Sequence, residues 1–149
     1  MFRINRETDY AIRVILSLAK RPPGTITPSA EIRQEMDLPE SLSLQIISGL
    51  VKHGFLNSFP GRSGGIQLSA PAREISLLDL ITSCQGPLEI AECLDQPGIC
   101  RRTEHCPVRT TWQNIRNKLE AELNQINFQT LAEGDGQPDQ NLVFSELGT

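Results

Sequence analysis

Three of the four cysteines in this 149-residue chain lie close together, between Cys93 and Cys106, in the segment CLDQPGICRRTEHC. The middle one is Cys100, so the spacing is C-x6-C-x5-C around a Pro97-Gly98 turn. Buried structural cysteines usually sit singly among aliphatic residues, whereas charged side chains surround these three. The segment therefore predicts a loop that presents thiols to a ligand, and we call residues 93–106 the cysteine loop.

Three kinds of chemistry fit these thiols. A metal ion or an iron-sulfur cluster would bind them as thiolates, and the neighbouring Arg101 and Arg102 would stabilise thiolate and cluster charge. The spacing lacks the C-x2-C pairs of common structural zinc sites, and three thiolates need a fourth donor. A thiol–disulfide switch is the second interpretation, and cysteines without a chemical role are the third.

The fourth cysteine, Cys84, stands apart from this loop. It follows Ile81 by three residues in a short apolar segment. Ser76 is the expected N-cap of this segment, and the acidic residue Asp79 follows three residues later, as in a capping box. We therefore predict a short helix in which the Cys84 thiol packs into the core.

The length indicates either one ordinary domain or a small domain with an extension. The net charge of the chain is −4. Residues 1–70 hold eight basic and six acidic side chains, whereas residues 71–149 hold six basic and twelve acidic ones. A basic half is suited to contact with the phosphates of a nucleic acid. No uncharged stretch is long enough to span a bilayer. We expect a cytoplasmic protein that does not contact membranes, in a reducing compartment where clustered cysteines more often mean metal or redox chemistry than structural disulfides.

The first half of the chain predicts three helices and a hairpin. Helices are expected from Thr8, as the N-cap, to about residue 20, from Thr27-Pro28 to about residue 36, and from Pro39 to His53. Two short strands, 55–59 and 66–68, flank the glycine-rich loop Pro60-Gly61-Arg62-Ser63-Gly64-Gly65. A helix-turn-helix followed by a hairpin is the order of a winged helix, so we expect a mainly α fold with a small β-hairpin wing. Arg62 would then approach a phosphate or the minor groove, unless this loop is only a flexible turn.

The C-terminal half predicts a long helix with one apolar stripe. The stripe residues are Val108, Trp112, Ile115, Leu119, Leu123 and Ile126. Such a seam must pack against something, and we favour a second copy of the chain over its own domain. The expected division is a winged helix-turn-helix domain at 1–70, a connecting helix and the cysteine loop at 71–106, a dimerisation helix at 107–131, and a polar, disordered tail at 132–149.

Several motifs in this order resemble the Rrf2 family of bacterial winged-helix regulators, which includes the IscR and NsrR types. They are Asp9-Tyr10-Ala11-Ile12-Arg13, the segment Leu50-Val51-Lys52-His53-Gly54-Phe55-Leu56, the wing Gly61-Arg62-Ser63-Gly64-Gly65, and the three loop cysteines. The resemblance covers about residues 2–130. It implies a homodimer that binds double-stranded DNA at an inverted-repeat operator, with the third helix in the major groove and the wing at the minor groove.

The resemblance also implies site residues. Carried onto this sequence, an iron-sulfur cluster would be held by Cys93, Cys100 and Cys106, and DNA contacts would come from Ser41, Leu42, Gln45 and Arg62.

The fourth cluster ligand differs among members of the family. In the IscR type a histidine lies three residues after the last cysteine, where this chain has Arg109. In the NsrR type an aspartate near the start of the first helix, donated by the other subunit, completes a four-iron cluster, and Asp9 matches that position. We favour Asp9 and a four-iron cluster; His105 is the competing ligand, and a two-iron cluster is the alternative.

We therefore expect a homodimeric transcriptional regulator whose iron-sulfur cluster senses nitric oxide, iron or redox state. The alternatives are a cluster-free regulator that senses oxidants through a disulfide and a zinc-binding interaction module that does not touch DNA. We do not expect an enzyme, since the sequence contains no nucleophile–base arrangement and no phosphate-binding loop.

Overall fold

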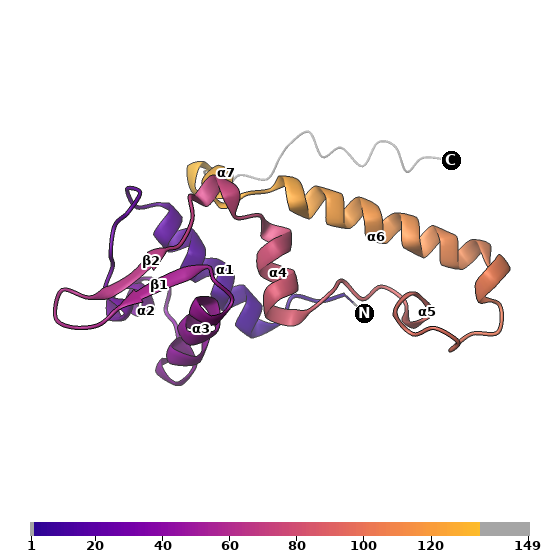
Figure 1. The fold of residues 1–149 in the computed structure, drawn as a ribbon, viewed down its shortest axis with the longest axis horizontal. Coiled ribbons are helices and arrows are strands. Elements are labelled where there is room, and N and C mark those ends of the chain that lie inside the picture. The colour runs from indigo at the N-terminus through magenta and orange to yellow at the C-terminus, as the bar shows by residue number, and fades with distance from the viewer. Residues whose placement is uncertain (1, 135–149) are drawn as a thin grey trace.

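The computed structural model describes residues 2–134, so residues 135–149, most of the expected tail, lie outside the described part of the chain. The elements are α1 (Arg6–Ala19), α2 (Ser29–Glu35), α3 (Glu40–Lys52), β1 (Leu56–Phe59), β2 (Gly65–Leu68), η1 (Ala72–Glu74), α4 (Leu77–Gln85), α5 (Glu92–Asp95), η2 (Thr103–His105), α6 (Pro107–Gln125) and α7 (Phe128–Glu133) (Figure 1). The expectation of a mainly α fold with a small β-hairpin is confirmed.

Helix α1 lies at the centre of the core. Its apolar residues recur every three or four positions, and Val14 and Ile15 are completely buried. The helix begins before the expected cap: Asn5 is the N-cap, and its side-chain oxygen accepts from the Thr8 backbone N–H at 2.8 Å. Thr8 itself is buried in the first turn, so Asn5 fills the capping position that the sequence analysis gave to Thr8.

The two strands pair antiparallel with Leu56 opposite Leu68 and Phe59 opposite Gly65. Leu56 and Ile66 point into the core, which packs the hairpin onto the helices. An isolated bridge between Thr27 and Ile66 adds the segment before α2 to the base of the wing, with the Thr27 N–H donating to the Ile66 carbonyl at 2.9 Å.

The core continues past residue 70. Helices α4 and α7 both pack against α1, and Ile75, Leu80 and Phe128 belong to the same hydrophobic cluster as the residues of α1 and α3. We call α1 to α4, the hairpin and α7 the winged body. The boundary expected at residue 70 therefore does not separate two cores.

The expected helix over 107–131 is two helices. Helix α6 ends at Gln125, Ile126 is extended, and the Asn127 side chain caps α7 by accepting from the Thr130 N–H at 3.0 Å. The chain turns here because Phe128 is completely buried in the winged body, where its N–H donates to the Ile75 carbonyl at 3.1 Å. The free energy gained by burying this aromatic side chain exceeds what continuation of the helix would contribute.

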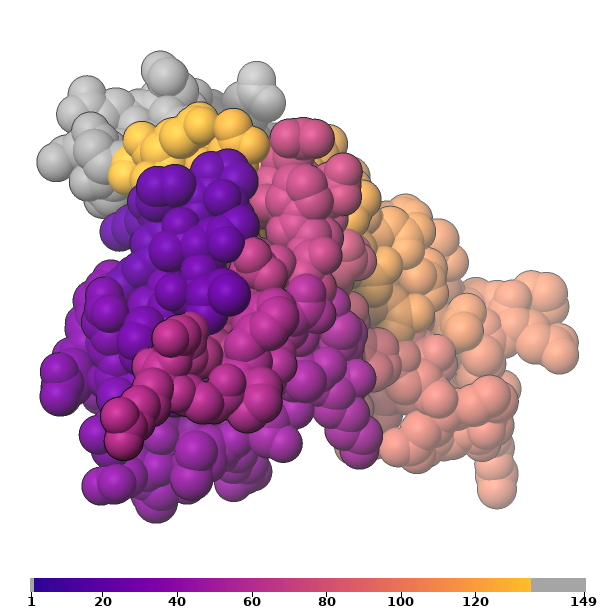
Figure 2. All heavy atoms as spheres, turned by 60° about the vertical axis from the view of Figure 1, so that its left-hand side comes forward, coloured from indigo at the N-terminus to yellow at the C-terminus, as the bar shows by residue number. Residues whose placement is uncertain are grey.

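Residues 92–125 form an arm that projects from the winged body. The arm carries α5, the cysteine loop, η2 and α6, and both overall views show its outer end standing away from the body (Figures 1 and 2). Helix α6 packs on α4 and α5, yet none of its own residues is buried. None of the helices within residues 2–134 is long and apolar enough to cross a bilayer.

Candidate functional site

Helix α3, the second helix of the helix-turn-helix, has one polar face that is open to solvent. Its buried residues are Ser43, Ile46, Ile47 and Leu50. Exposed residues lie on the other side at spacings of three and four, namely Ser41, Leu44, Gln45 and Ser48. The predicted DNA contacts Ser41 and Gln45 therefore share one outward face.

Leu42 does not share that face. It is half-buried and packs against the core, whereas Leu44 is 73% exposed. The periodicity of the helix explains this placement, because Leu42 precedes Ile46 by four residues and Leu50 by eight, on the buried stripe. Leu42, expected at the DNA from the resemblance, therefore lies on the buried stripe, whereas Leu44, which the sequence analysis did not name, faces solvent. The DNA contacts themselves stay a prediction.

The N-terminal part of α1 lies beside this face. The Gln45 Nε2 donates to Glu7 Oε1 at 3.5 Å, and the Arg6 Nε donates to the Tyr10 hydroxyl at 3.0 Å. Arg13 lies 5.9 Å from the centre of the Tyr10 ring. Two guanidinium groups are therefore held near the helix-turn-helix on one aromatic side chain.

The wing presents Arg62, which is exposed in the loop between β1 and β2. Two glycines shape this loop. A Cβ on Gly64 would overlap the backbone of Phe59 and Pro60, and one on Gly65 would overlap the Thr27 backbone. The close approach of these backbones, and not only flexibility, therefore accounts for the glycines in the wing.

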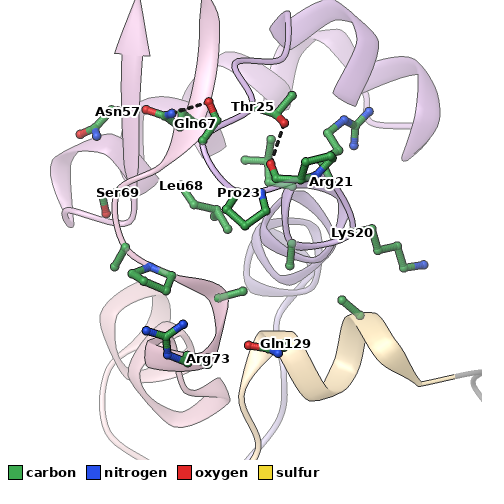
Figure 3. A pocket seen from close by; sticks show the side chains of 18 of the residues that line it. Lys20, Arg21, Pro23, Thr25, Asn57, Gln67, Leu68, Ser69, Arg73 and Gln129 are labelled. Atoms are coloured by element: carbon green, nitrogen blue, oxygen red, sulfur yellow. Dashed lines mark hydrogen bonds between the residues drawn. The ribbon is translucent and has the colours of Figure 1, made fainter.

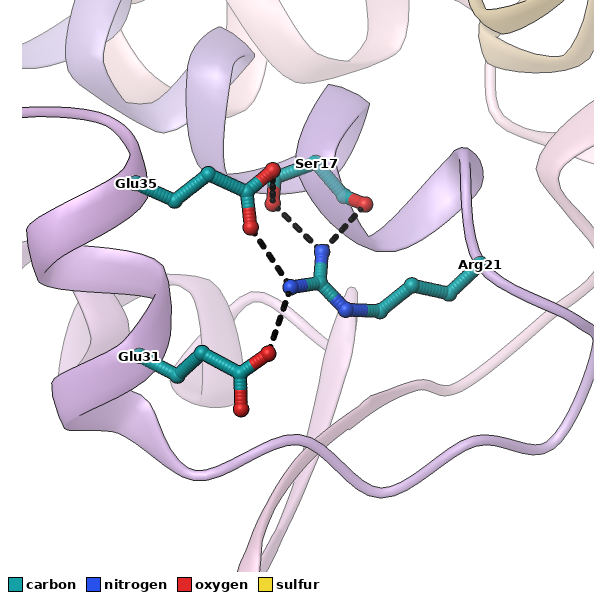
Figure 4. Close-up of polar contacts among 4 residues, drawn as sticks. All are labelled: Ser17, Arg21, Glu31 and Glu35. Atoms are coloured by element: carbon teal, nitrogen blue, oxygen red, sulfur yellow. Dashed lines mark hydrogen bonds and ion pairs between the residues drawn. The ribbon is translucent and has the colours of Figure 1, made fainter.

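A polar network fixes α2 against α1 (Figure 4). Arg21 donates from Nη1 to the Ser17 carbonyl and hydroxyl at 2.8 and 2.7 Å, and from Nη2 to Glu35 at 2.6 Å and Glu31 at 3.2 Å. The hydrogen bond to Glu35 raises the pKa of Arg21, and the same bond lowers the pKa of Glu35. This network sets the position of the first helix of the helix-turn-helix.

The three loop cysteines lie on different parts of the arm. Cys93 is in α5, Cys100 is in the turn that follows, and Cys106 is the N-cap residue of α6. All three are half-buried free thiols. Residues 98 and 100–108 line a pocket of about 770 Å³ that includes Cys100 and Cys106 but not Cys93. Within residues 2–134, no three His, Cys, Asp or Glu side chains are grouped closely enough to hold a metal ion.

Two arginines fasten the cysteine loop to α6. The Arg109 Nε donates to the Cys93 carbonyl at 3.2 Å, and Arg116 forms an ion pair with Asp95 at 2.5 Å. Sequence analysis missed both contacts, because they join residues 16 and 21 positions apart and no local pattern marks them. The loop is therefore held to the long helix by polar contacts.

The remaining candidate ligands lie away from the thiols or on the surface. Asp9 pairs with Arg13 of its own helix at 2.9 Å, and its side chain is 46% exposed. His105 is exposed in η2, next to Cys106.

Cys84 packs against the core as expected, and burial raises the pKa of its thiol.

A second cavity, of about 730 Å³, lies between the end of α1, the base of the wing and α7 (Figure 3). Arg73 and Gln129 lie on its α7 side, and Gln67 donates to the Gly24 carbonyl at 2.7 Å on its wing side. Most of its lining side chains are exposed or half-exposed, so it is an open groove on the surface of the winged body.

Known proteins resemble this chain over nearly its whole described length. Residues 4–134 match the Rrf2 family, described as iron-dependent transcriptional regulators. CymR of B. subtilis, the global cysteine regulator, is 26% identical with a TM-score of 0.73, over 89% of this chain and 98% of that one. The oxidised form of Staphylococcus aureus CymR is 26% identical with a TM-score of 0.69, over 91% and 99%.

A third solved structure, T. potens IscR, is 21% identical with a TM-score of 0.69 over 93% of each chain, which shows a shared fold. The family match covers the helix-turn-helix, the wing, the cysteine loop and both C-terminal helices. The chain therefore belongs to the Rrf2 family of DNA-binding transcriptional regulators, which are not enzymes.

Proposed function

We propose that this protein is a homodimeric regulator whose cysteine loop controls DNA affinity by holding an iron-sulfur cluster. The observation that carries the proposal is that the loop with three half-buried thiols is attached to α6, through Arg109 at Cys93 and Arg116 at Asp95. Helix α6 packs on α4, and α4 packs on α1 beside the helix-turn-helix. A change in the loop would therefore be passed to the DNA-binding surface through packed helices.

The exposed stripe of α6 supports the homodimer. Val108, Trp112 and Ile115 are 55%, 39% and 43% exposed, on a helix that has no buried residue of its own. A second copy that laid the same stripe against this one would cover both by two-fold symmetry. Two winged bodies would then face an inverted-repeat operator, and their separation would have to match the helical repeat of the DNA.

The outward face of α3 would enter the major groove, with Ser41 and Gln45 as the polar contacts. Arg62 at the exposed wing would reach the minor groove or a phosphate. Such contacts need the two wings and the two α3 helices of a dimer to be correctly spaced, so a modest change of angle at α6 would produce a large change in affinity.

The donor set suits an iron-sulfur cluster. In a four-iron cluster each iron would take one protein ligand, so the three sulfurs need not converge on one point as they must for a single ion. Cys93, Cys100 and Cys106 would be ligands, and Asp9 of the second subunit or His105 would supply the fourth. When bound, the cluster would supply a redox-active group that reacts with oxidants or nitric oxide and depends on iron supply.

The first test is anaerobic purification followed by visible absorbance and quantification of iron and sulfide. A brown protein with about four irons per chain would support a four-iron cluster with Asp9, and about two would favour another fourth ligand. Cys100→Ala should lose the cluster and keep the fold. Cys84→Ala is the matched control, because it removes the thiol outside the loop and should keep the cluster.

The variants Asp9→Asn and His105→Ala separate the two candidates for the fourth ligand. The variant that removes the fourth ligand should lose or destabilise the cluster, whereas the other variant should bind the cluster as the wild type does. A Cys100→Ala protein with full cluster absorbance would overturn the assignment of the ligands.

A thiol–disulfide switch is the second candidate, supported by three partly accessible thiols on one loop. It predicts a protein that stays colourless after reconstitution and loses two free thiols on treatment with a mild oxidant. Operator binding should then change on oxidation and recover on reduction, and Cys84→Ala should respond as the wild type does.

A further inference from the structure

Leu44 is the most exposed large hydrophobic side chain within residues 2–134. It is 73% exposed in the middle of α3, whereas the next, Val108, is 55% exposed. Leu44 belongs to the winged body, and Val108 belongs to the arm, so the two lie in different parts of the molecule (Figure 1). A second copy that covers α6 therefore leaves the exposure of Leu44 unexplained.

The neighbours of Leu44 on this face all carry hydrogen-bonding groups. Ser41 and Ser48 lie one turn before and one turn after it, and Gln45 follows it directly. The Gln45 Nε2 donates to Glu7, which leaves the amide oxygen of Gln45 free to accept. Leu44 is thus one apolar group within a face suited to base edges.

Leucine can neither donate nor accept a hydrogen bond, so it cannot distinguish the polar atoms of bases. The one apolar group that a base pair presents in the major groove is the C5-methyl group of thymine. We propose that Leu44 contacts a thymine methyl group in each half-site and so selects a T·A pair there. This inference rests on the proposed function, in which α3 enters the major groove.

The contact would favour thymine in two ways. Packing of the leucine against the methyl group removes apolar surface from water. Cytosine lacks the methyl group, and a purine at this position presents an N7 acceptor that would lose its water without gaining a donor, because Leu44 offers none. Attraction and rejection therefore act on the same base pair.

The experiment begins with the full-length protein and a random pool of duplex DNA, from which bound sequences are selected. Each thymine of the selected site is then replaced by deoxyuridine, which differs only by the methyl group. We expect one thymine per half-site to matter, with affinity falling about four-fold for each methyl group lost. Replacement in both half-sites should lower affinity by more than about ten-fold.

Leu44→Ala provides the decisive comparison. It should weaken binding to the thymine site and abolish the difference between thymine and uracil at that position. Ser48→Ala is the matched control, since Ser48 is exposed one turn further along the same face. It should keep the full penalty for uracil.

The possible results separate this inference from the function on which it rests. A protein that selects no DNA overturns both. A protein that binds its selected site equally well with uracil at every thymine overturns the inference alone. The inference is also overturned if Leu44→Ala keeps the penalty for uracil, since another side chain then contacts the methyl group.

Discussion

The winged body and the arm are built on different principles. In the body, α1 is surrounded by α2, α3, β2, α4 and α7, and Val14, Ile15, Leu80 and Phe128 are completely buried. In the arm, a 19-residue helix has no buried residue and the cysteine loop is attached to it by polar contacts. One chain thus supplies a complete core for the body and leaves the apolar stripe of the arm exposed.

This difference indicates where the stability of the protein resides and where the proposed response would take place. Apolar packing holds the body in one arrangement, because moving one helix would open cavities. Polar contacts such as Arg116–Asp95 fix fewer atoms of the cysteine loop than apolar packing would. The conformation of the arm can therefore change while the body stays folded. The proposed sensor would need that combination of a fixed DNA-binding unit and an adjustable connection between two copies of it.

The largest expected effect is on the core of the body. Phe128→Ala would remove a completely buried ring of α7, which packs against α1 and η1, and should lower the free energy of unfolding by about 3–5 kcal/mol. Urea unfolding followed by far-ultraviolet circular dichroism measures this change. Ile99→Ala, in the half-exposed part of the arm, is the control and should change it by less than about 1 kcal/mol. Equal effects of the two variants would break the comparison.

The second expected effect is on the arm. Trp112→Asp would place a charge in the proposed interface between two α6 helices and should raise the dissociation constant of the dimer about 100-fold or more. Analytical ultracentrifugation measures this constant, and circular dichroism should show an intact body. Asn114→Asp introduces the same charge on the opposite side of α6 and should leave the dimer unchanged. A Trp112→Asp protein that remains dimeric would place the interface elsewhere.

The third expected effect is on the contact between α1 and α2 within the body. Arg21 lowers the pKa of Glu35 in the folded protein, below its ordinary value of 4.5, so this interaction stabilises the fold above that pH. Glu35→Gln should cost about 1 kcal/mol at pH 7, since the side chain is 39% exposed. The difference from wild type should shrink as pH falls below 4.5 and through the lower pKa of the folded state.

Thermal unfolding at a series of pH values measures this dependence. Glu31→Gln is the control, because Glu31 is 59% exposed and its bond to Arg21 is longer, at 3.2 Å. Its effect should be smaller at every pH. A Glu35→Gln penalty that persists unchanged at pH 3 would show that the carboxylate charge is not responsible.

Local patterns in the sequence predicted much of the body and little of how its parts meet. The serine cap of α4 is confirmed, with Ser76 accepting from the Asp79 N–H at 3.0 Å, because capping depends on neighbouring residues only. The order of helices and hairpin follows from the same kind of local signal. By contrast, Arg21 and Glu35 are fourteen residues apart, and nothing in either segment indicates that they meet.

The expected extent of the C-terminal helix was wrong for a reason that lies outside that helix. Its apolar stripe continues through Ile126, but burial of Phe128 in the core of the body ends the helix at Gln125. Tertiary packing, which local periodicity does not encode, decides where the helix ends. The placement of Leu42 differs, because its spacing of four and eight residues from Ile46 and Leu50 already puts it on the buried stripe of α3.

The smallest expected effect concerns the cysteines, which divide between the two regions. Burial in the body raises the pKa of the Cys84 thiol, so less of the reactive thiolate is present at neutral pH. In cluster-free protein, iodoacetamide should alkylate Cys84 after Cys93, Cys100 and Cys106, as peptide mass spectrometry can follow. Unfolding in urea should remove the difference. If Cys84 reacted as fast as the others in folded protein, its thiol would not be held by the body's packing, and the separation between a packed body and an accessible arm would fail for these residues.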